Sequence, residues 1–413
     1  MDVAWMQAAL PDMLADIEAL VTCESPSADL AAVARSADIV ARVGTRRLGV
    51  APEHIVLDGR THLRWRLGNG PVRVLLLGHH DTVWPIGSLI THPFTVDGNV
   101  LRGPGCFDMK AGVVMAFHAA AAVQGAGALG DRVSVTILIT GDEEIGSPSS
   151  RELIEAEAAG CAAALVLEAS ADGGALKTER KGVSVYQVRL AGRAAHAGLE
   201  PERGVNAAVE LAHQLLAVSA LGRPDRGTTV TPTLTTAGTT TNTVPAAGEF
   251  AVDVRVRDTG EQTRVDAALR ALRPVLDGAR LEVMGGPNRP PLAADASAEL
   301  FARAEVLAGE LGLPALMAAA VGGGSDGNLT AGVGTPTLDG LGAVGGGAHA
   351  DHEHVLVAEL PRRAALVAAL VADRANGRLA SVAGGAKGRL AGVAGGAQPT
   401  AAFLVGTDDD ERQ

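Results

Sequence analysis

The stretch VRVLLLGHHDT at residues 72–82 decides the fold class of this chain. It begins with a continuous aliphatic run, which is typical of a strand buried on both faces inside a helix-covered sheet. Two similar runs follow, VSVTILIT at 133–140 and AALVL at 163–167, and helical patterns follow Met109 and Ser149. Because strands alternate with helices, the sequence predicts an α/β fold.

Helices are also expected ahead of the first strand. Apolar residues recur at helical spacing from about Val3 to Val21, and again from Leu30 to about Arg47. After Arg289 the α/β pattern resumes with a helix from Asp295 to Leu311. We therefore expect residues 1–181 and 289–378 to form one catalytic domain with a mostly parallel sheet.

The pattern changes at Gly182, where apolar residues begin to alternate with polar ones. The expected order of elements from there is β-α-β-β-α-β, which is the ferredoxin-like α+β arrangement. Residues 182–288 therefore read as a second domain inserted into the first. The expected elements are strands from Gly182, from Thr229 to Ala237, from Glu249 to Val256 and from Arg280 to Met284, and helices from Val205 to Val218 and from Gln262 to Leu276.

The end of the chain, residues 379–413, has a different composition. It contains GRLASVAGGAK followed at once by GRLAGVAGGAQ, and later the acidic run DDDER. Such a segment buries too little apolar surface to offset the entropy lost on ordering. We expect disorder after about residue 380.

Composition excludes several classes of function. The net charge of -12 over 413 residues disfavours nucleic acid as a partner, since phosphate binding needs clustered Lys and Arg. Three cysteines without paired spacing suit a reducing compartment, and the N-terminus lacks the features of a signal peptide. No apolar run reaches the length of a membrane-spanning helix. The sequence predicts a cytoplasmic protein without a membrane partner.

Polar residues gather where the expected parallel strands end. His79 and Asp81 follow the first strand, and Glu143 and Glu144 follow the VSVTILIT strand. A histidine there can bind a metal while a carboxylate fixes its tautomer, although a merely polar role for this HHD stretch is an equal alternative. Adjacent carboxylates repel each other unless a cation compensates, so a metal site is favoured over a solvated turn.

Three further residues complete this pattern. Asp108 precedes a helix in GPGCFDMKAG, where capping that helix is the alternative role. Glu168 ends the AALVL strand, and His349 lies in the glycine-rich loop GAVGGGAHADHEH. Two histidines and three carboxylates can hold two zinc ions, with one carboxylate shared, and Co²⁺ or Mn²⁺ suits the same groups.

The motifs GHHDTV, GPGCFDMKAG, GDEEIGS, LVLEAS, GRAAHAG and GGGAHADHE resemble those of the M20 metallopeptidase family, in order and spacing, up to about residue 375. The likeness is greatest to its glutamate carboxypeptidase-like branch. It implies that Asp108 bridges two zinc ions, that His79 and Glu168 complete one site, and that Glu144 and His349 complete the other. It also implies that Glu143 is the general base and that Asp81 orients His79.

The resemblance assigns roles outside the metal ligands as well. The inserted domain would be a lid that forms a homodimer, with His196 reaching the active site of the other subunit; without the family, His196 would be a surface or capping residue. Asn242 and Arg289 would hold the carbonyl or free carboxylate of the substrate. The backbone of 322–328, including Gly323 and Ser325, would complete the cradle.

The expected reaction is hydrolysis of an amide bond in a small peptide, with release of a terminal amino acid. The alternative keeps the same site but makes the protein an N-acyl amino acid deacylase, depending on whether Arg289 or Lys181 meets a carboxylate. A catalytically silent binding paralogue is the distant alternative, and the presence of all five ligands and Glu143 argues against it.

Overall fold

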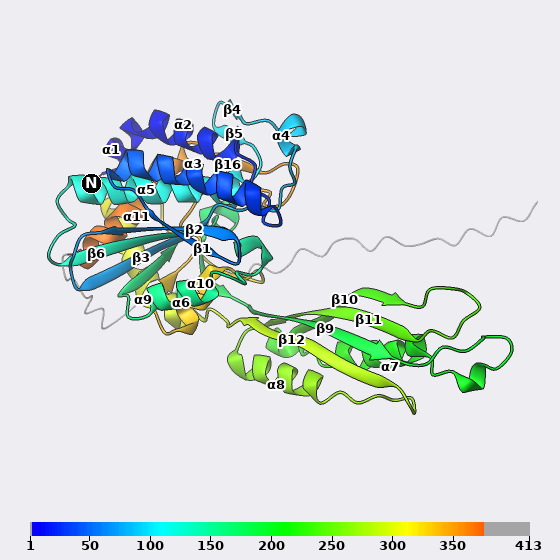
Figure 1. Ribbon diagram of the computed structural model, residues 1–413. Helices are drawn as coiled ribbons and strands as arrows, with labels where there is room; N and C mark the ends of the chain where they lie inside the picture. Colours follow the sequence, from blue (N-terminus) through cyan, green and yellow to red (C-terminus); the bar gives the residue numbers. More distant parts are fainter. Residues whose placement is uncertain (1, 376–413) are drawn as a thin grey trace, which may run out of the picture. The chain divides into compact units, whose positions relative to one another are not determined.

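The computed structural model describes residues 2–375 (Figure 1). The tail predicted to be disordered, 379–413, lies outside these residues, and so do residues 376–378 of the second predicted catalytic segment. The fold therefore consists of the elements between residues 3 and 375.

A six-stranded sheet forms the centre of the larger part of the fold. Its strand order is β1-β2-β6-β3-β7-β14, and β6, β3, β7 and β14 run parallel, whereas β1 and β2 pair antiparallel at one edge. This mostly parallel sheet is the one that the sequence predicted. The strands are β1 (Glu53–Leu57), β2 (Arg60–Leu67), β3 (Val72–His79), β6 (Val133–Thr140), β7 (Ala163–Val166) and β14 (Thr337–Leu338).

The central strand β3 is buried on both faces because its aliphatic side chains alternate between two cores. Leu76 packs into the large core that contains helices α2, α3, α5 and α11, while Leu75 and Leu77 pack into a smaller core with α6 and α10. All three leucines are 0% exposed. Burial of each such side chain contributes about 1.5–3 kcal/mol, so β3 is firmly placed before its polar end, His79, is reached.

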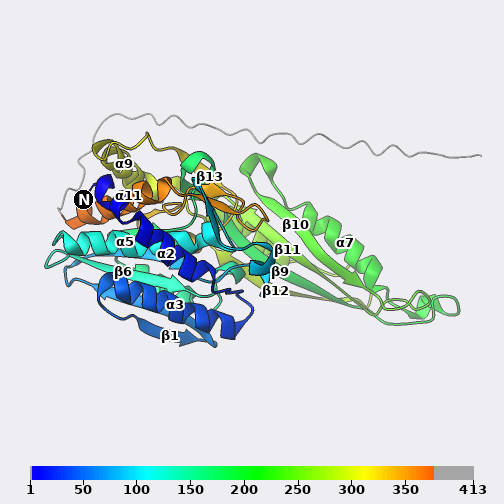
Figure 2. The same ribbon diagram turned by 90° about the horizontal axis from the view of Figure 1, so that it is seen from above.

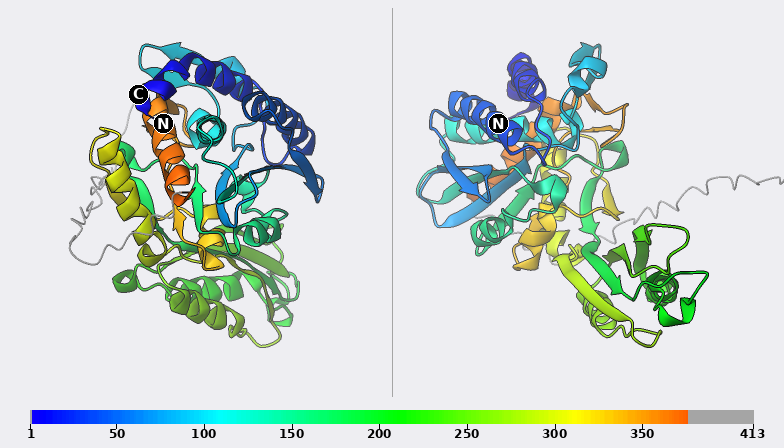
Figure 3. Two further views of the ribbon diagram at one scale, coloured as in Figure 1. Left: turned by 90° about the vertical axis from the view of Figure 1, so that its left-hand side faces the viewer. Right: turned by 45° about the vertical axis from the view of Figure 1, so that its right-hand side comes forward.

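Helices cover both faces of this sheet, as Figures 1 and 3 show. The helices α1, α2, α3, α5 and α11 belong to the large core, and α9 joins it through Leu300. The helices α6 and α10 cover the opposite face. The helices are α1 (Val3–Ala8), α2 (Leu10–Val21), α3 (Leu30–Leu48), α5 (Ala111–Gly125), α6 (Arg151–Ala158), α9 (Ala294–Glu310), α10 (Asp326–Gly332) and α11 (Glu359–Ala375).

Small strands outside the main sheet bring distant loops together. β15 (Gly345–Gly346), β16 (His354–Leu356), β5 (Val100–Arg102) and β4 (Thr95–Asp97) form a four-stranded sheet in that order, and α4 (Ser88–Thr91) precedes β4. β8 (Leu176–Arg180) pairs in parallel with β13 (Ala318–Val321). The pairing of β16 with β5 places the loop before β16 beside the loop after β5.

The inserted segment has the predicted β-α-β-β-α-β order. Its antiparallel sheet runs β10-β11-β9-β12, and both helices pack on one face around a separate core that includes Tyr186 and Phe250 (Figures 1 and 2). This is the ferredoxin-like topology; its folding as a domain apart from the rest remains a prediction. The elements are β9 (Gly182–Ala191), α7 (Ala207–Ser219), β10 (Thr229–Ala237), β11 (Ala247–Val256), α8 (Thr259–Arg270) and β12 (Arg280–Arg289).

Two predicted helices differ from the observed ones for local reasons. The expected helix from Val3 to Val21 is two helices, because Pro11 lies in the first turn of a second helix that starts after Ala9. The expected helix from Gln262 to Leu276 begins and ends earlier. Asp258 caps it by accepting a hydrogen bond from the Glu261 N–H at 2.8 Å, and it ends at Arg270.

One segment runs against the expectation that no stretch is apolar enough to cross a membrane. Within the described residues, Cys106–Gly125 passes that test by length and composition. However, 89% of the apolar window is buried inside the protein. α5 lies in this segment and packs in the large core, so the apolar side chains of the segment are explained by their burial there.

Candidate active site

His79 is the last residue of β3 and is 1% exposed. Its Nδ1 lies 2.9 Å from the backbone oxygen of Asp81 and 3.5 Å from that residue's carboxylate. The Asp81 carboxylate also accepts hydrogen bonds from the N–H groups of Glu143 and Glu144, each at 3.2 Å. Asp81 thus lies where it can orient His79, as predicted, and it also holds the loop that carries both glutamates.

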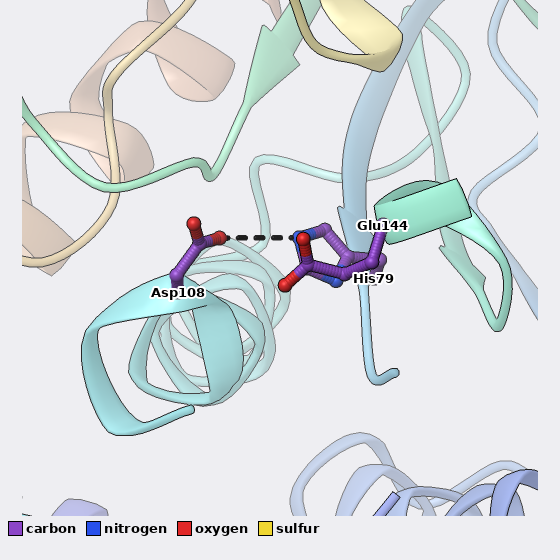
Figure 4. A group of neighbouring side chains, drawn as sticks. All are labelled: His79, Asp108 and Glu144. Atoms are coloured by element: carbon purple, nitrogen blue, oxygen red, sulfur yellow. Dashed lines mark ion pairs between the residues drawn. The ribbon is translucent and has the colours of Figure 1, made fainter. Parts of the chain in front are cut away.

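Asp108 lies between the two predicted metal-binding histidines. One carboxylate oxygen is 3.3 Å from Nε2 of His79, and the other is 3.3 Å from Nε2 of His349. Figure 4 shows the Asp108 carboxylate facing the imidazole of His79, with Glu144 beside them. A carboxylate with one oxygen toward each histidine has the arrangement of a bridging ligand.

The remaining two carboxylates contact different histidines. Glu168 follows β7, and its Oε1 is 3.5 Å from Nε2 of His79. Glu144 follows β6, and its Oε2 is 3.1 Å from Nε2 of His349. A grouping by mutual distance within 4.8 Å instead places Glu144 with His79 and Asp108. Glu144 therefore lies close to both histidines, with its direct contact to His349.

The unsatisfied atoms in this cluster fit a metal. Within residues 2–375, the buried Nε2 of His79 and Oε1 of Glu144 have no hydrogen-bond partner. A buried polar atom without a partner is costly. Imidazole nitrogen and carboxylate oxygen are the donor types that zinc accepts, so a cation at this place would satisfy both atoms.

The charges of the cluster also favour a cation. Hydrogen bonds to Asp108 and Glu144 raise the pKa of His349 to about 10. Burial alone would raise the pKa of Asp108, but its close contacts with the imidazoles of His349 and His79 lower it below its ordinary value. The Asp108 carboxylate therefore remains ionised and draws positive charge toward the space between the histidines.

Glu143 contacts an arginine instead of a histidine. Its Oε1 lies 2.7 Å from Nη2 of Arg289, and its side chain is 11% exposed. Burial raises the pKa of Glu143 well above its ordinary value, while the charge of Arg289 opposes that rise. A carboxylate with a raised pKa beside a metal cluster suits transfer of a proton near neutral pH.

Arg289 lies at the cavity, but its donors are already engaged by the protein. Besides Glu143, its guanidinium donates to the hydroxyl of Ser147 at 2.9 Å, to the carboxylate of Asp326 at 3.0 Å and to the backbone oxygen of Ser325 at 2.9 Å. The predicted contact with a substrate carboxylate would require Arg289 to exchange some of these partners.

The other predicted substrate groups are only partly brought together. Gly323 lines the cavity. Ser325 does not: it is 0% exposed, caps α10 and donates its hydroxyl to Asp339 at 2.6 Å. His196 and Asn242 are exposed neighbours in the inserted segment, where the N–H of Ala197 donates to the Asn242 carbonyl at 2.9 Å. Neither lines the cavity of its own chain.

Lys177 is a cavity residue that sequence reasoning missed. The cavity, of about 800 Å³, is lined by the cations Lys177, Arg180, Arg255 and Arg289 as well as by predicted metal ligands. Each arginine has a carboxylate partner, whereas the Lys177 ammonium has none within the described part of the chain. Burial, together with the charge of Arg180, lowers the pKa of Lys177. The basic run KTERK, soon after Glu168, was the available signal.

Comparison with known proteins decides the family. The model of peptidase family M20/M25/M40 matches residues 75–373, which include all five predicted metal ligands. The chain belongs to this family. It is therefore an enzyme of the metal-dependent M20 peptidase and amidohydrolase type, and the resemblance found in its sequence motifs is confirmed.

Two curated relatives of this M20 peptidase differ in the reaction that their names state. It is 32% identical over 319 residues to carboxypeptidase G2 from Pseudomonas sp. (strain RS-16), covering 75% of this chain and 76% of the relative. It is 27% identical over 242 residues to succinyl-diaminopimelate desuccinylase from Afipia carboxidovorans, covering 54% of this chain and 62% of the relative. Both peptidase and deacylase reactions are thus represented among its relatives.

A solved structure confirms the fold of this M20 peptidase. The aminopeptidase PepT from Bacillus cereus matches with a TM-score of 0.67 at 21% identity, over 89% of this chain and 99% of the other. At that identity the likeness concerns the fold, and it agrees with the predicted α/β class and inserted segment.

Proposed function

We propose that this M20 peptidase is a dinuclear zinc hydrolase that cleaves an amide bond to release a terminal amino acid, in the manner of a glutamate carboxypeptidase. One observation carries the proposal: the Asp108 carboxylate lies 3.3 Å from Nε2 of both His79 and His349. A single carboxylate placed between two imidazoles can serve two metal ions at once, which supports a two-metal site.

In this proposal the ligands divide into two sets that share Asp108. His79 and Glu168 would hold one ion, and His349 and Glu144 would hold the other. When bound, the ions supply Lewis acidity, which lowers the pKa of water and polarises the amide carbonyl. The donor set also admits Co²⁺ or Mn²⁺.

Glu143 would move the proton. The attacking water gives its proton to the Glu143 carboxylate while its oxygen bonds to the amide carbon. The C–N bond then breaks, and Glu143 returns the proton to the leaving nitrogen. Arg289, 2.7 Å away, would hold the Glu143 carboxylate in place during both transfers.

Lys177 supports a substrate with a negative charge. Among the lysine and arginine side chains that line the cavity, Lys177 alone has no carboxylate partner within residues 2–375. A terminal carboxylate beside the scissile amide would supply that partner, since a charged hydrogen bond is worth about 1.5–3 kcal/mol. Lys181, considered from the sequence, lines a different cavity together with Arg257.

A second candidate keeps the site and changes the substrate. An N-acyl amino acid deacylase would place an acyl group in the cavity, and an acidic acyl group would meet Lys177 equally well. The similarity to a desuccinylase favours this candidate. The two candidates differ in which side of the amide carries the carboxylate that Lys177 binds.

Three further parts of the proposal concern assembly and location. We propose a homodimer formed through the inserted segment, because His196 and Asn242 are exposed and outside the cavity of their own chain. His196 of a second copy would donate a hydrogen bond to the developing oxyanion. A cytoplasmic location is supported by the three unpaired cysteines.

The test measures metal content and substrate choice together. Elemental analysis should find two zinc ions per chain, and a chelator should abolish hydrolysis of folyl-glutamate, dipeptide or N-acetyl and N-succinyl amino acid substrates. Release of terminal glutamate would support the carboxypeptidase, whereas preference for the N-acyl substrates would support the deacylase. Protein that binds no metal and hydrolyses none of them would contradict both and leave a binding protein.

A further inference from the structure

A single carboxylate, Glu353, connects the loops that carry two metal ligands. It follows His349 in the loop before β16 and is 3% exposed. Its Oε1 accepts hydrogen bonds from the backbone N–H of Phe107 at 2.9 Å and of Asp108 at 3.0 Å. The residue proposed to bridge the metals is thus held through its own backbone by a side chain from the His349 loop.

The second oxygen of Glu353 extends this connection. Oε2 accepts a hydrogen bond from the backbone N–H of Gly105 at 3.0 Å and from Nε1 of Trp84 at 2.6 Å. Trp84 lies shortly after His79 in the sequence. One buried carboxylate therefore receives donors from the segments that carry His79 and Asp108, while it belongs to the segment that carries His349.

These segments have little regular structure to hold them. Gly105 and Gly347 have φ values of 70° and 76°, and His349 itself has a φ of 62°, in the left-handed region that few side chains adopt. Glycine adopts this conformation freely, whereas His349 keeps it only where the surroundings fix it. The donors to Glu353 provide that fixation, because hydrogen bonds to an ionised acceptor are stronger than neutral ones.

We propose that Glu353 is a positioning residue that fixes the separation of Asp108 and His349, and thereby the affinity of the metal site that these two ligands share. The inference rests on the ligand set proposed above. Glu353 would not touch metal or substrate. Its removal should resemble the loss of other groups that orient metal ligands, which typically weakens metal binding about 10–100-fold.

The experiment measures zinc affinity without turnover. The full chain is depleted of metal and titrated with zinc against a chromogenic chelator, for wild type, Glu353→Ala and Glu353→Gln. Glu353→Ala should weaken binding of at least one zinc about 10–100-fold. Glu353→Gln should lose less, because its amide oxygen can still accept two of the four hydrogen bonds, and excess free zinc should restore its kcat.

Glu24→Gln is the matched control. Glu24 also accepts two backbone hydrogen bonds, from Gly87 at 2.8 Å and Leu89 at 2.9 Å, but the loop that it holds carries no proposed ligand. This variant should bind zinc like wild type. The unfolding midpoints of the metal-free variants show whether each protein is folded when it is titrated.

Three outcomes would overturn the inference. Unchanged zinc affinity in folded Glu353→Ala would show that the loops hold their geometry without this residue. An equal loss in Glu24→Gln would show that any nearby loop contact matters as much. Wild type that binds no zinc would remove the ligand set and the inference together, whereas zinc binding without amide hydrolysis would fail the proposed reaction and leave the affinity comparison decisive.

Discussion

The six-stranded central sheet and the four-stranded sheet of the inserted segment hold their functional residues in different ways. β3 is buried on both faces and ends in His79, which is 1% exposed. β11, also an interior strand, alternates between buried and partly exposed residues because helices cover one face of its sheet. His196 and Asn242 are exposed in loops of that second sheet.

This difference separates two kinds of site residue. Three of the proposed metal ligands, His79, Glu144 and Glu168, end or follow buried strands of the central sheet, and the five proposed ligands lie together in the single chain. The groups predicted to contact substrate from the inserted segment lie outside the cavity of their own chain. In the proposed function they would act only with a further partner, whether the substrate or a second copy of the chain.

The largest effect is expected from Glu143→Gln, a change at the end of the central sheet. Loss of the base should lower kcat by about 10²–10⁴-fold, while metal content stays at the wild-type value, because Glu143 is not a proposed ligand. Steady-state kinetics and elemental analysis check this prediction. Near wild-type turnover in a fully metallated variant would show that another group takes the proton.

His196→Ala tests the residues of the inserted segment. Removal of an oxyanion donor should lower kcat by about 10²–10³-fold, although His196 is exposed and remote from the cavity lining of its own chain. The mixture of His196→Ala with Glu143→Gln should then regain activity, because one active site in a mixed dimer receives both intact groups.

Subunit exchange must be demonstrated for the mixing experiment, for example with two affinity tags. Proven exchange without any recovery of activity would contradict the proposed contribution of His196 from a second copy. A wild-type rate for His196→Ala by itself would remove the residue from the mechanism.

The sequence predicted the central sheet and the residues at its edge well, because the patterns that indicate them are local. Aliphatic runs identify β3 and β6, and side chains at the ends of parallel strands must converge at one edge of the sheet. That rule, together with the motif resemblance, predicted His79, Glu144 and Glu168 in one site, and their side chains lie near one another in the structure.

The missed parts depend on contacts between distant residues, with one exception. β8 is defined by its pairing with β13, far along the chain. The KTERK run alone therefore did not show that Lys177 lines the cavity. The internal partners of Arg289 are likewise nonlocal. The exception is the β1–β2 hairpin, whose turn Asp58-Gly59 has φ values of 49° and 77° and carries a recognisable hairpin signal.

Lys177→Met is expected to change substrate binding more than chemistry. The variant keeps an unbranched side chain one atom shorter and removes its charge, so a substrate carboxylate loses one charged hydrogen bond worth about 1.5–3 kcal/mol, or roughly 10–150-fold in KM. Lys181→Met, in the neighbouring cavity, is the control and should leave KM unchanged. An equal loss for substrates with and without the free carboxylate would count against a recognition role.

The smallest effect concerns the stability of the large core and of the core in the inserted segment. Asp16 is 0% exposed and accepts hydrogen bonds from Arg47 at 2.6 Å and His118 at 3.0 Å. Burial alone would raise the pKa of Asp16, but its hydrogen bonds with His118 and Arg47 lower it from 3.8 to about 2. Since the folded pKa is the lower one, this carboxylate stabilises the fold above about pH 4 and ceases to do so as the pH falls toward 2.

Asp16→Asn should therefore reduce the free energy of unfolding by about 2 kcal/mol at pH 7, and the difference from wild type should shrink toward pH 2. Urea unfolding at several pH values measures this. Glu261→Gln is the matching variant in the inserted segment, where hydrogen bonds from Arg264 lower the pKa of Glu261 to about 2. If the large core and the core of the inserted segment unfold separately, each variant will shift a different unfolding transition. One shared transition would mean that the inserted sheet, despite its open face, is stabilised by the central sheet.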